Sequence, residues 1–242
     1  MKQENTRIKS LVQLSKRWIS VLLALLLAAC LIATWACGTK ALPPRLYVGD
    51  KWVYKQTSQG LDYTRTETVV NEETIEGKDC YVVNVVFTPP LQGWVGGYTE
   101  WRDKATYSPV RQRFCASVPS AGNNTMNRLI EYSDQVTGSE WPYKVGNTFT
   151  IKESRTISDV FADQYPTPMT SEQVTTFKVT NTEEIEFAFG NLTCFKTAGY
   201  QGGNDTFDYW YSEKAKAYVK HFTILENGII DELVSYSVRF NQ

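Results

Sequence analysis

The chain has 242 residues and a formal net charge of −1, from 25 Lys and Arg against 26 Asp and Glu. Its content of 42% hydrophobic and 13% aromatic residues is enough for a packed core, so disorder is not the default expectation. Residues 1–29 hold five of the basic groups and one acidic group, which leaves 20 against 25, or −5, for the rest. This acidic body has no Lys/Arg run, so we expect no nucleic-acid partner.

Residues 1–29 predict export from the cytoplasm. Five basic residues precede the apolar run 21–29, which ends in small residues, as in a secretory signal. Leu27-Ala28-Ala29-Cys30 also matches the lipobox of bacterial lipoprotein signals, in which the cysteine is acylated, for example with palmitate, and becomes the first mature residue. We therefore predict a signal peptide over 1–29 and lipidation of Cys30.

Two other interpretations of this segment stay open besides a plain cleaved signal. Cys37 is followed by a polar tether, whereas Cys30 is followed by apolar residues, but Trp35 stands where a lipobox has a small or aliphatic residue. Residues 18–37 carry no charge and have the length, ~20 residues, of an uncleaved membrane anchor. Every alternative places the body outside the cytoplasm, and we expect a lipid or a helix to hold it at the bacterial cell membrane.

The remaining chain predicts an all-β protein behind a tether over residues 30–45. Short alternating segments rich in Val, Thr, Tyr and Phe are separated by Gly, Asn, Asp and Pro. In the segment 230–240, apolar and polar residues alternate, which predicts one buried and one solvated face of an antiparallel sheet. The apolar residues expected to be buried there are Val234, Tyr236, Val238 and Phe240.

Several motifs occur twice in the same order. VGDKWVYK at 48–55 resembles VGNTFTIK at 145–152, and NEETIE at 71–76 resembles NTEEIE at 181–186. A Cys-aromatic pair follows each of the second motifs. We predict two β repeats, over 46–140 and 141–242, each an antiparallel meander with one apolar face. Such units are expected to pair as a sandwich or as two half-barrels.

A family resemblance rests on the first motif of each repeat, of the form VG-x-x-W/F-x-Y/I, and on the segments YWYS at 209–212 and AYVK at 217–220. The chain resembles bacterial cell-envelope lipoproteins of the TapB-like kind, which are loosely similar to LolA/LolB-type half-barrel carriers. The resemblance covers most of residues 46–240 and implies a β-rich, non-enzymatic envelope protein. It carries over no functional residue.

Candidates for catalysis are few. His221 is the single histidine, and it lies in a predicted strand without a neighbouring triad residue, so we interpret it as a half-buried strand residue rather than a base. Cys80 and Cys194 occupy equivalent positions in the two repeats and are expected to be core residues. Disulfide pairing stays open among Cys37, Cys80, Cys115 and Cys194. An enzyme would need a cleft where His221, or carboxylates of different strands, converge.

Metal and cofactor sites are not predicted. The pairs Glu72-Glu73 and Glu183-Glu184 are expected in solvated turns at strand ends, where neighbouring side chains do not converge on one atom. The oxygen-rich segment 202–208 lacks the register of a calcium loop. We therefore expect no metal, no cofactor and no enzymatic activity.

Two connections carry apolar and aromatic residues, FTPPLQGWVGGY at 87–98 and FADQYPTPM at 161–169. Such residues on a connection either cover the core as a lid or form a contact surface. The candidate ligand or partner residues are Pro89, Pro90, Leu91, Trp94, Tyr98, Phe161 and Tyr165. The sequence predicts a non-catalytic, membrane-anchored lipoprotein that binds an apolar, lipid-like ligand or an envelope protein. The alternative is a structural or assembly protein without a ligand pocket.

Overall fold

The computed structural model describes residues 40–58, 60–90, 94–118, 124–137, 141–160, 168–223 and 228–240. The predicted signal peptide, both candidate lipidation sites and the alternative anchor 18–37 lie outside these ranges. The described residues form strands, turns and irregular connections. Within the described ranges, no helix has the length and apolarity needed to span a membrane.

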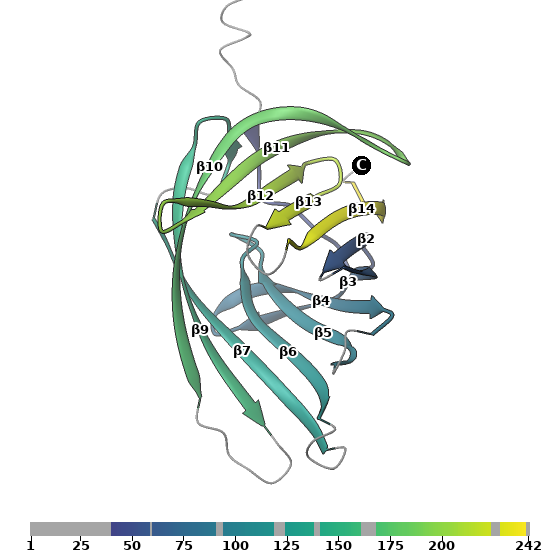
Figure 1. Cartoon of the computed structure of the whole chain (residues 1–242), viewed down its shortest axis with the longest axis vertical. Coiled ribbons are helices and arrows are strands. Elements are labelled where there is room, and N and C mark those ends of the chain that lie inside the picture. The colour runs from purple at the N-terminus through teal and green to yellow at the C-terminus, as the bar shows by residue number, and fades with distance from the viewer. Residues whose placement is uncertain are drawn as a thin grey trace, which may run out of the picture. The chain divides into compact units, whose positions relative to one another are not determined.

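Twelve antiparallel strands form one closed barrel (Figure 1). They are β2 (Lys51–Ser58), β3 (Leu61–Ile75), β4 (Lys78–Thr88), β5 (Trp94–Asp103), β6 (Pro109–Val118), β7 (Asn124–Thr137), β9 (Thr148–Val160), β10 (Met169–Phe187), β11 (Gly190–Gln201), β12 (Asn204–Ser212), β13 (Ala217–Thr223) and β14 (Ile230–Ser237). Two short strands, β1 (Lys40–Ala41) and β8 (Tyr143–Lys144), pair with each other. The all-β, antiparallel prediction is confirmed. The sandwich and the paired half-barrels are not, because all twelve strands close into a single barrel, which pairs both edges of the sheet.

The barrel consists of two runs of six strands that are consecutive in the chain. Strands β2 to β7 lie side by side, as do β9 to β14, and the pairs β7–β9 and β14–β2 join the two runs. We call β2–β7 the first half and β9–β14 the second half. Both joining pairs link segments that belong to different predicted repeats.

The entry into each half has the same backbone hydrogen bonds. The Gly49 amide donates to the Val69 carbonyl at 2.7 Å, and the Gly146 amide donates to the Val179 carbonyl at 2.8 Å. The amides of Val69 and Val179 each donate back, at 2.9 Å, to the residue after that glycine. Both glycines have a positive φ, 98° and 92°, a conformation that favours glycine. The recurring VG motif thus forms one specific turn at two places.

Side chains recur at matching positions as well. The strand register is shifted directly after Val69 in the first half and directly after Val179 in the second. The indole nitrogen of Trp101 donates to Glu73 at 2.9 Å, and that of Trp210 donates to Glu183. Each half therefore repeats both a bulge and a Trp–Glu contact.

Part of the predicted tether packs on the barrel. Ala41 is fully buried in a cluster with Tyr143, Phe149 and other aromatic residues. Leu46 is 2% exposed, and its amide donates to the hydroxyl of Tyr81 at 3.1 Å. Residues 40–46 are thus built into the folded unit, because their apolar side chains and backbone find partners there.

The predicted inward face of the last strand is partly wrong. Val234 is 49% exposed, whereas Asp231 and Leu233 are buried. The register with β2 shifts between Leu233 and Ser235, so Val234 is an extra residue in a bulge, and the alternation changes phase there. The exposed Phe240 lies beyond the end of β14.

Candidate functional site

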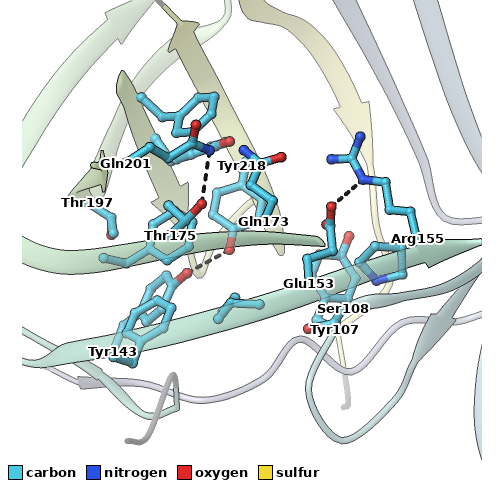
Figure 2. Close-up of a pocket in the computed structure, with 16 residues that line it drawn as sticks. Tyr107, Ser108, Tyr143, Glu153, Arg155, Gln173, Thr175, Thr197, Gln201 and Tyr218 are labelled. Atoms are coloured by element: carbon cyan, nitrogen blue, oxygen red, sulfur yellow. Dashed lines mark hydrogen bonds and ion pairs between the residues drawn. The ribbon is translucent and has the colours of Figure 1, made fainter. Parts of the chain in front are cut away.

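A cavity of about 240 Å³ lies on the inner face of the second half (Figure 2). Strands β9 to β13 supply most of its wall, mainly through side chains at every second position of a strand. We call it the aromatic chamber. Its lining residues are Tyr107, Ser108, Pro109, Tyr143, Phe149, Ile151, Glu153, Arg155, Gln173, Thr175, Phe177, Thr197, Gln201, Phe207, Tyr209 and Tyr218.

The rings of the aromatic chamber pack against one another across neighbouring strands. Phe149 and Phe177 stack with centroids 5.2 Å apart, and Phe177 contacts Tyr209 at 6.1 Å. Gly199 makes this packing fit, because a Cβ atom there would lie 3.0 Å from the ring of Phe177 and 3.1 Å from that of Phe207. A residue without a side chain thus sits between the two rings.

Hydrogen-bonding groups face the same chamber. The side-chain amide of Gln201 donates to the Thr175 hydroxyl at 3.0 Å, and the hydroxyls of Tyr143 and Tyr218 lie 2.6 Å apart. Arg155 and Glu153 form an ion pair that lies apart from these two contacts in Figure 2. The chamber therefore offers aromatic surface together with a few fixed polar groups, the usual makeup of a small-molecule site.

A second cavity, of about 260 Å³, adjoins the first. We call it the charged chamber. The two chambers share Tyr107, Pro109, Tyr209 and Tyr218, so these residues form a common wall. The lining of the charged chamber is Tyr54, Arg65, Glu67, Glu100, Arg102, Tyr107, Pro109, Tyr209, Ala217, Tyr218, His221 and Asp231.

Ion pairs connect the charged residues of this chamber. Arg65 contacts Glu67 at 2.8 Å and Asp231 at 3.3 Å, while Arg102 contacts Glu67 at 3.0 Å and also pairs with Glu100. Burial alone would raise the pKa of Glu67, but Arg102 and Arg65 outweigh it and hold that pKa below its ordinary value. Glu67 is therefore a carboxylate in the folded protein at neutral pH.

Tyr107 stands between the chambers in an uncommon backbone conformation. Its φ is +63°, which is strained for a bulky residue, and its side chain is buried. Arg102 donates to its hydroxyl at 2.9 Å. Burial raises the pKa of Tyr107, so the phenol stays neutral. The network thus fixes one aromatic ring in the wall common to both chambers.

The charged network is absent from the sequence-based candidates. Its signal is the i, i+2 spacing of opposite charges in Arg65-Thr66-Glu67 and Glu100-Trp101-Arg102, which places both charges of each motif on one strand face. Such a pattern is also typical of a solvated face. Only the tertiary pairing shows that this face is the inner one.

His221 lies in β13 and is half-buried, as expected for a strand residue. Its ring stacks on Tyr209 with centroids 4.4 Å apart, and its Nδ1 atom is 3.6 Å from Asp231. It therefore faces a carboxylate of the neighbouring strand β14. Its Nε2 atom has no hydrogen-bond partner among the described residues, so no described serine or cysteine is held in position as a nucleophile.

The predicted ligand or partner residues do not form one described surface. Pro89 and Pro90 are exposed after β4, and the backbone of Trp94 begins β5, while its side chain lies outside the description. Leu91, Phe161 and Tyr165 lie outside the described residues. Tyr98 belongs to β5 and contacts Phe114, with ring centroids 4.7 Å apart, inside the barrel.

The cysteines and the paired glutamates are placed as follows. Cys80 and Cys194 are fully buried, which confirms their core position, and none of the three described cysteines is in a disulfide. Burial raises the pKa of both thiols, that of Cys194 to about 12. The glutamate pairs were predicted in turns, which is wrong: they lie within β3 and β10, and the turns follow at residues 76–77 and 188–189. Among the described residues no cluster of His, Cys, Asp or Glu is arranged to hold a metal ion.

No protein-family model matches the chain, and no curated protein matches it. One solved structure, of a candidate lipoprotein from Parabacteroides distasonis, is similar over 82% of this chain and all of its own. The identity is 10% and the TM-score 0.35. Similarity of this size defines neither the fold nor the function.

Proposed function

We propose that the chain is a membrane-anchored, extracytoplasmic lipoprotein of a bacterial envelope that binds a small amphiphilic molecule inside its barrel. The aromatic chamber carries this proposal, since it combines about 240 Å³ of space with stacked rings and a few oriented polar groups. Barrels of this kind enclose ligands in their interior. The polar groups of the aromatic chamber narrow the predicted ligand, an apolar, lipid-like molecule, to one that also has a polar end.

The alternative of a structural or assembly protein predicts a barrel without a pocket, and both chambers favour the binding role over it. The non-catalytic role stays a prediction from the sequence. The anchor is proposed on the sequence, with Cys30 as the acylated residue and Cys37 or an uncleaved helix over 18–37 as alternatives.

We further propose that the two halves arose by duplication, with repeat boundaries at 46–140 and 141–242. The equivalent turn hydrogen bonds, bulges and Trp–Glu contacts support this origin. The resemblance to TapB-like and LolA/LolB-type lipoproteins is part of the same proposal, because the duplicated VG openings carry it.

A cavity-filling variant tests the binding site. Thr175 is 7% exposed and lines the aromatic chamber, so Thr175→Phe places a ring in the space of a ligand. Thr170→Phe on an exposed position of the same strand is the matched control. We expect calorimetric titration of the full chain in detergent with 3-ethylindole to show binding to the wild type and to Thr170→Phe, and at least about tenfold weaker binding to Thr175→Phe. Equal binding to all three would contradict this site.

The anchor has its own test, the intact mass of the protein extracted from bacterial membranes. We expect the wild-type mass to equal residues 30–242 plus acyl chains, and Cys30→Ala to retain residues 1–29 without acylation. A full-length wild-type chain would establish the uncleaved anchor instead, and an acylated chain beginning at Cys37 would move the lipid to that residue.

A further inference from the structure

Three buried polar atoms on residues that line the charged chamber have no hydrogen-bond partner among the described residues. They are Asp231 Oδ1, His221 Nε2 and Arg65 Nε. Asp231 is the most deeply buried of the three residues, with 7% of its surface exposed. A buried carboxylate oxygen without a donor is unfavourable, and native structures rarely retain one without a ligand, a water or a functional reason.

The charges around this oxygen do not balance. Arg65 and Arg102 face three carboxylates, those of Glu67, Glu100 and Asp231, so the carboxylates outnumber the arginines by one. The other ionisable side chains in the wall are tyrosines, and burial raises the pKa of Tyr54 and Tyr107, which keeps these phenols neutral. The chamber therefore favours a positive charge over a negative one.

The same kind of hydrogen-bond donor can satisfy both Asp231 Oδ1 and His221 Nε2. His221 Nδ1 faces Asp231 Oδ2 at 3.6 Å, and an imidazole that carries a single proton on Nδ1 leaves Nε2 as an acceptor. Both atoms belong to residues that line the chamber, and a group with several N–H donors satisfies both. Arg65 Nε is a donor, and an acceptor on the same ligand or a water molecule can satisfy it.

We infer that the charged chamber is a subsite for a primary ammonium group, which binds Asp231 Oδ1 and His221 Nε2 while the aromatic part of the same ligand occupies the aromatic chamber. This inference rests on the proposed function and adds the chemical class of the ligand, an aromatic amine. Tyr209 connects the two subsites, because it lines both chambers and its ring stacks on His221.

Three probes of matched shape test the inference by calorimetric titration of the full chain in detergent: tryptamine, 3-ethylindole and indole-3-propionate. They share the indole ring and differ in a positive, absent or negative end group. We expect the wild type to bind tryptamine at least about tenfold more tightly than 3-ethylindole, and indole-3-propionate most weakly, because a charge-assisted hydrogen bond is gained or a like charge is added.

Asp231→Asn removes the charge with little change of shape. We expect this variant to bind tryptamine at least about tenfold more weakly than the wild type and 3-ethylindole within about twofold of it. The matched control is Asp208→Asn, since Asp208 pairs with Lys196 away from both chambers. It is expected to leave all three affinities unchanged.

The outcomes distinguish failure of the ammonium subsite from failure of the proposed function. Binding of 3-ethylindole with no preference for tryptamine, or a preference for indole-3-propionate, overturns the ammonium subsite and leaves the barrel as a binding site. Absence of binding by all three probes contradicts the proposed function itself. The order of the three probes on the wild type tests the subsite even where Asp231→Asn fails to fold.

Discussion

The two halves of the barrel carry different side chains at positions that the strand register makes equivalent. Glu67 lies opposite Val85 in the first half, as Phe177 lies opposite Gly199 in the second. Glu100 lies opposite Val83, as Tyr209 lies opposite Thr197. In the same way Arg102 corresponds to Tyr211, since both lie opposite the aromatic residue that follows a buried cysteine. Charges in one half thus replace aromatic rings in the other.

This difference shows how one backbone arrangement provides two adjoining chambers. Aromatic rings contribute apolar burial and stack without a desolvation penalty. Buried ion pairs contribute little net stability, and well-packed apolar residues in their place are often neutral or stabilising. The proposed ammonium subsite therefore explains the charged half better than a contribution to stability does.

The largest expected effect contrasts Arg102 with its counterpart Tyr211. Arg102→Met leaves Glu67 and Glu100 without one of their partners, and we expect it to lower the free energy of unfolding by about 3–5 kcal/mol. Tyr211→Phe removes a buried hydroxyl that has no described hydrogen-bond partner, so it is expected to be neutral or slightly stabilising. Urea unfolding measures both, and equal losses would refute the contrast.

The next effect concerns the pH dependence of the charged half. The pKa of Glu67 is depressed in the folded state. Glu67 therefore contributes stability at pH values above its unfolded pKa, ~4.3, and this contribution is lost as the pH falls through its folded pKa. The groups around it are Arg65, Arg102, Glu100 and Asp231. We expect Glu67→Gln to lower stability by about 1–3 kcal/mol at pH 7, with the difference from wild type shrinking in acid. A difference independent of pH would contradict this account.

A smaller effect concerns the space between the rings of the second half. A Cβ atom at position 199 forces the rings of Phe177 and Phe207 to move by a few tenths of an ångström. We expect Gly199→Ala to lower stability by about 1 kcal/mol and to weaken binding of 3-ethylindole several-fold. Ala198→Gly on the neighbouring residue of β11 is the control for backbone effects. Unchanged binding in both variants would show that this part of the wall does not contact the ligand.

The smallest effect is kinetic and compares the cysteines. Cys80 and Cys194, at matching places of the two halves, are buried with raised pKa values, whereas Cys115 is half-buried. Because the thiolate is the reactive form, iodoacetamide labelling followed by peptide mass analysis is expected to modify Cys115 well before the other two. Faster labelling of Cys80 or Cys194 would mean that one half opens more readily than the structure indicates.

Local patterns predict much of this fold. The alternating segments, the repeated VG turns and the core position of Cys80 and Cys194 follow from residue spacing alone. Closure into one barrel does not, because the pair β14–β2 joins residues far apart in the chain. The bulge at Val234 also escapes a strict two-residue period.

The two chambers were harder to predict for a physical reason. Arg65 and Glu67 alternate with Thr as they would on a solvated strand face, so only the closed barrel identifies that face as the interior. The sequence drew attention instead to connections such as 161–169. Of the residues proposed in the two connections 87–98 and 161–169, Tyr98 alone is shown with its side chain inside the barrel.

The most direct test of the account is a crystal structure of the protein with tryptamine. We expect the indole ring in the aromatic chamber beside Phe177 and Tyr209, and the ammonium nitrogen within hydrogen-bond distance of Asp231 Oδ1. An indole bound only on the outer surface, or chambers that hold water alone at saturating tryptamine, would contradict it.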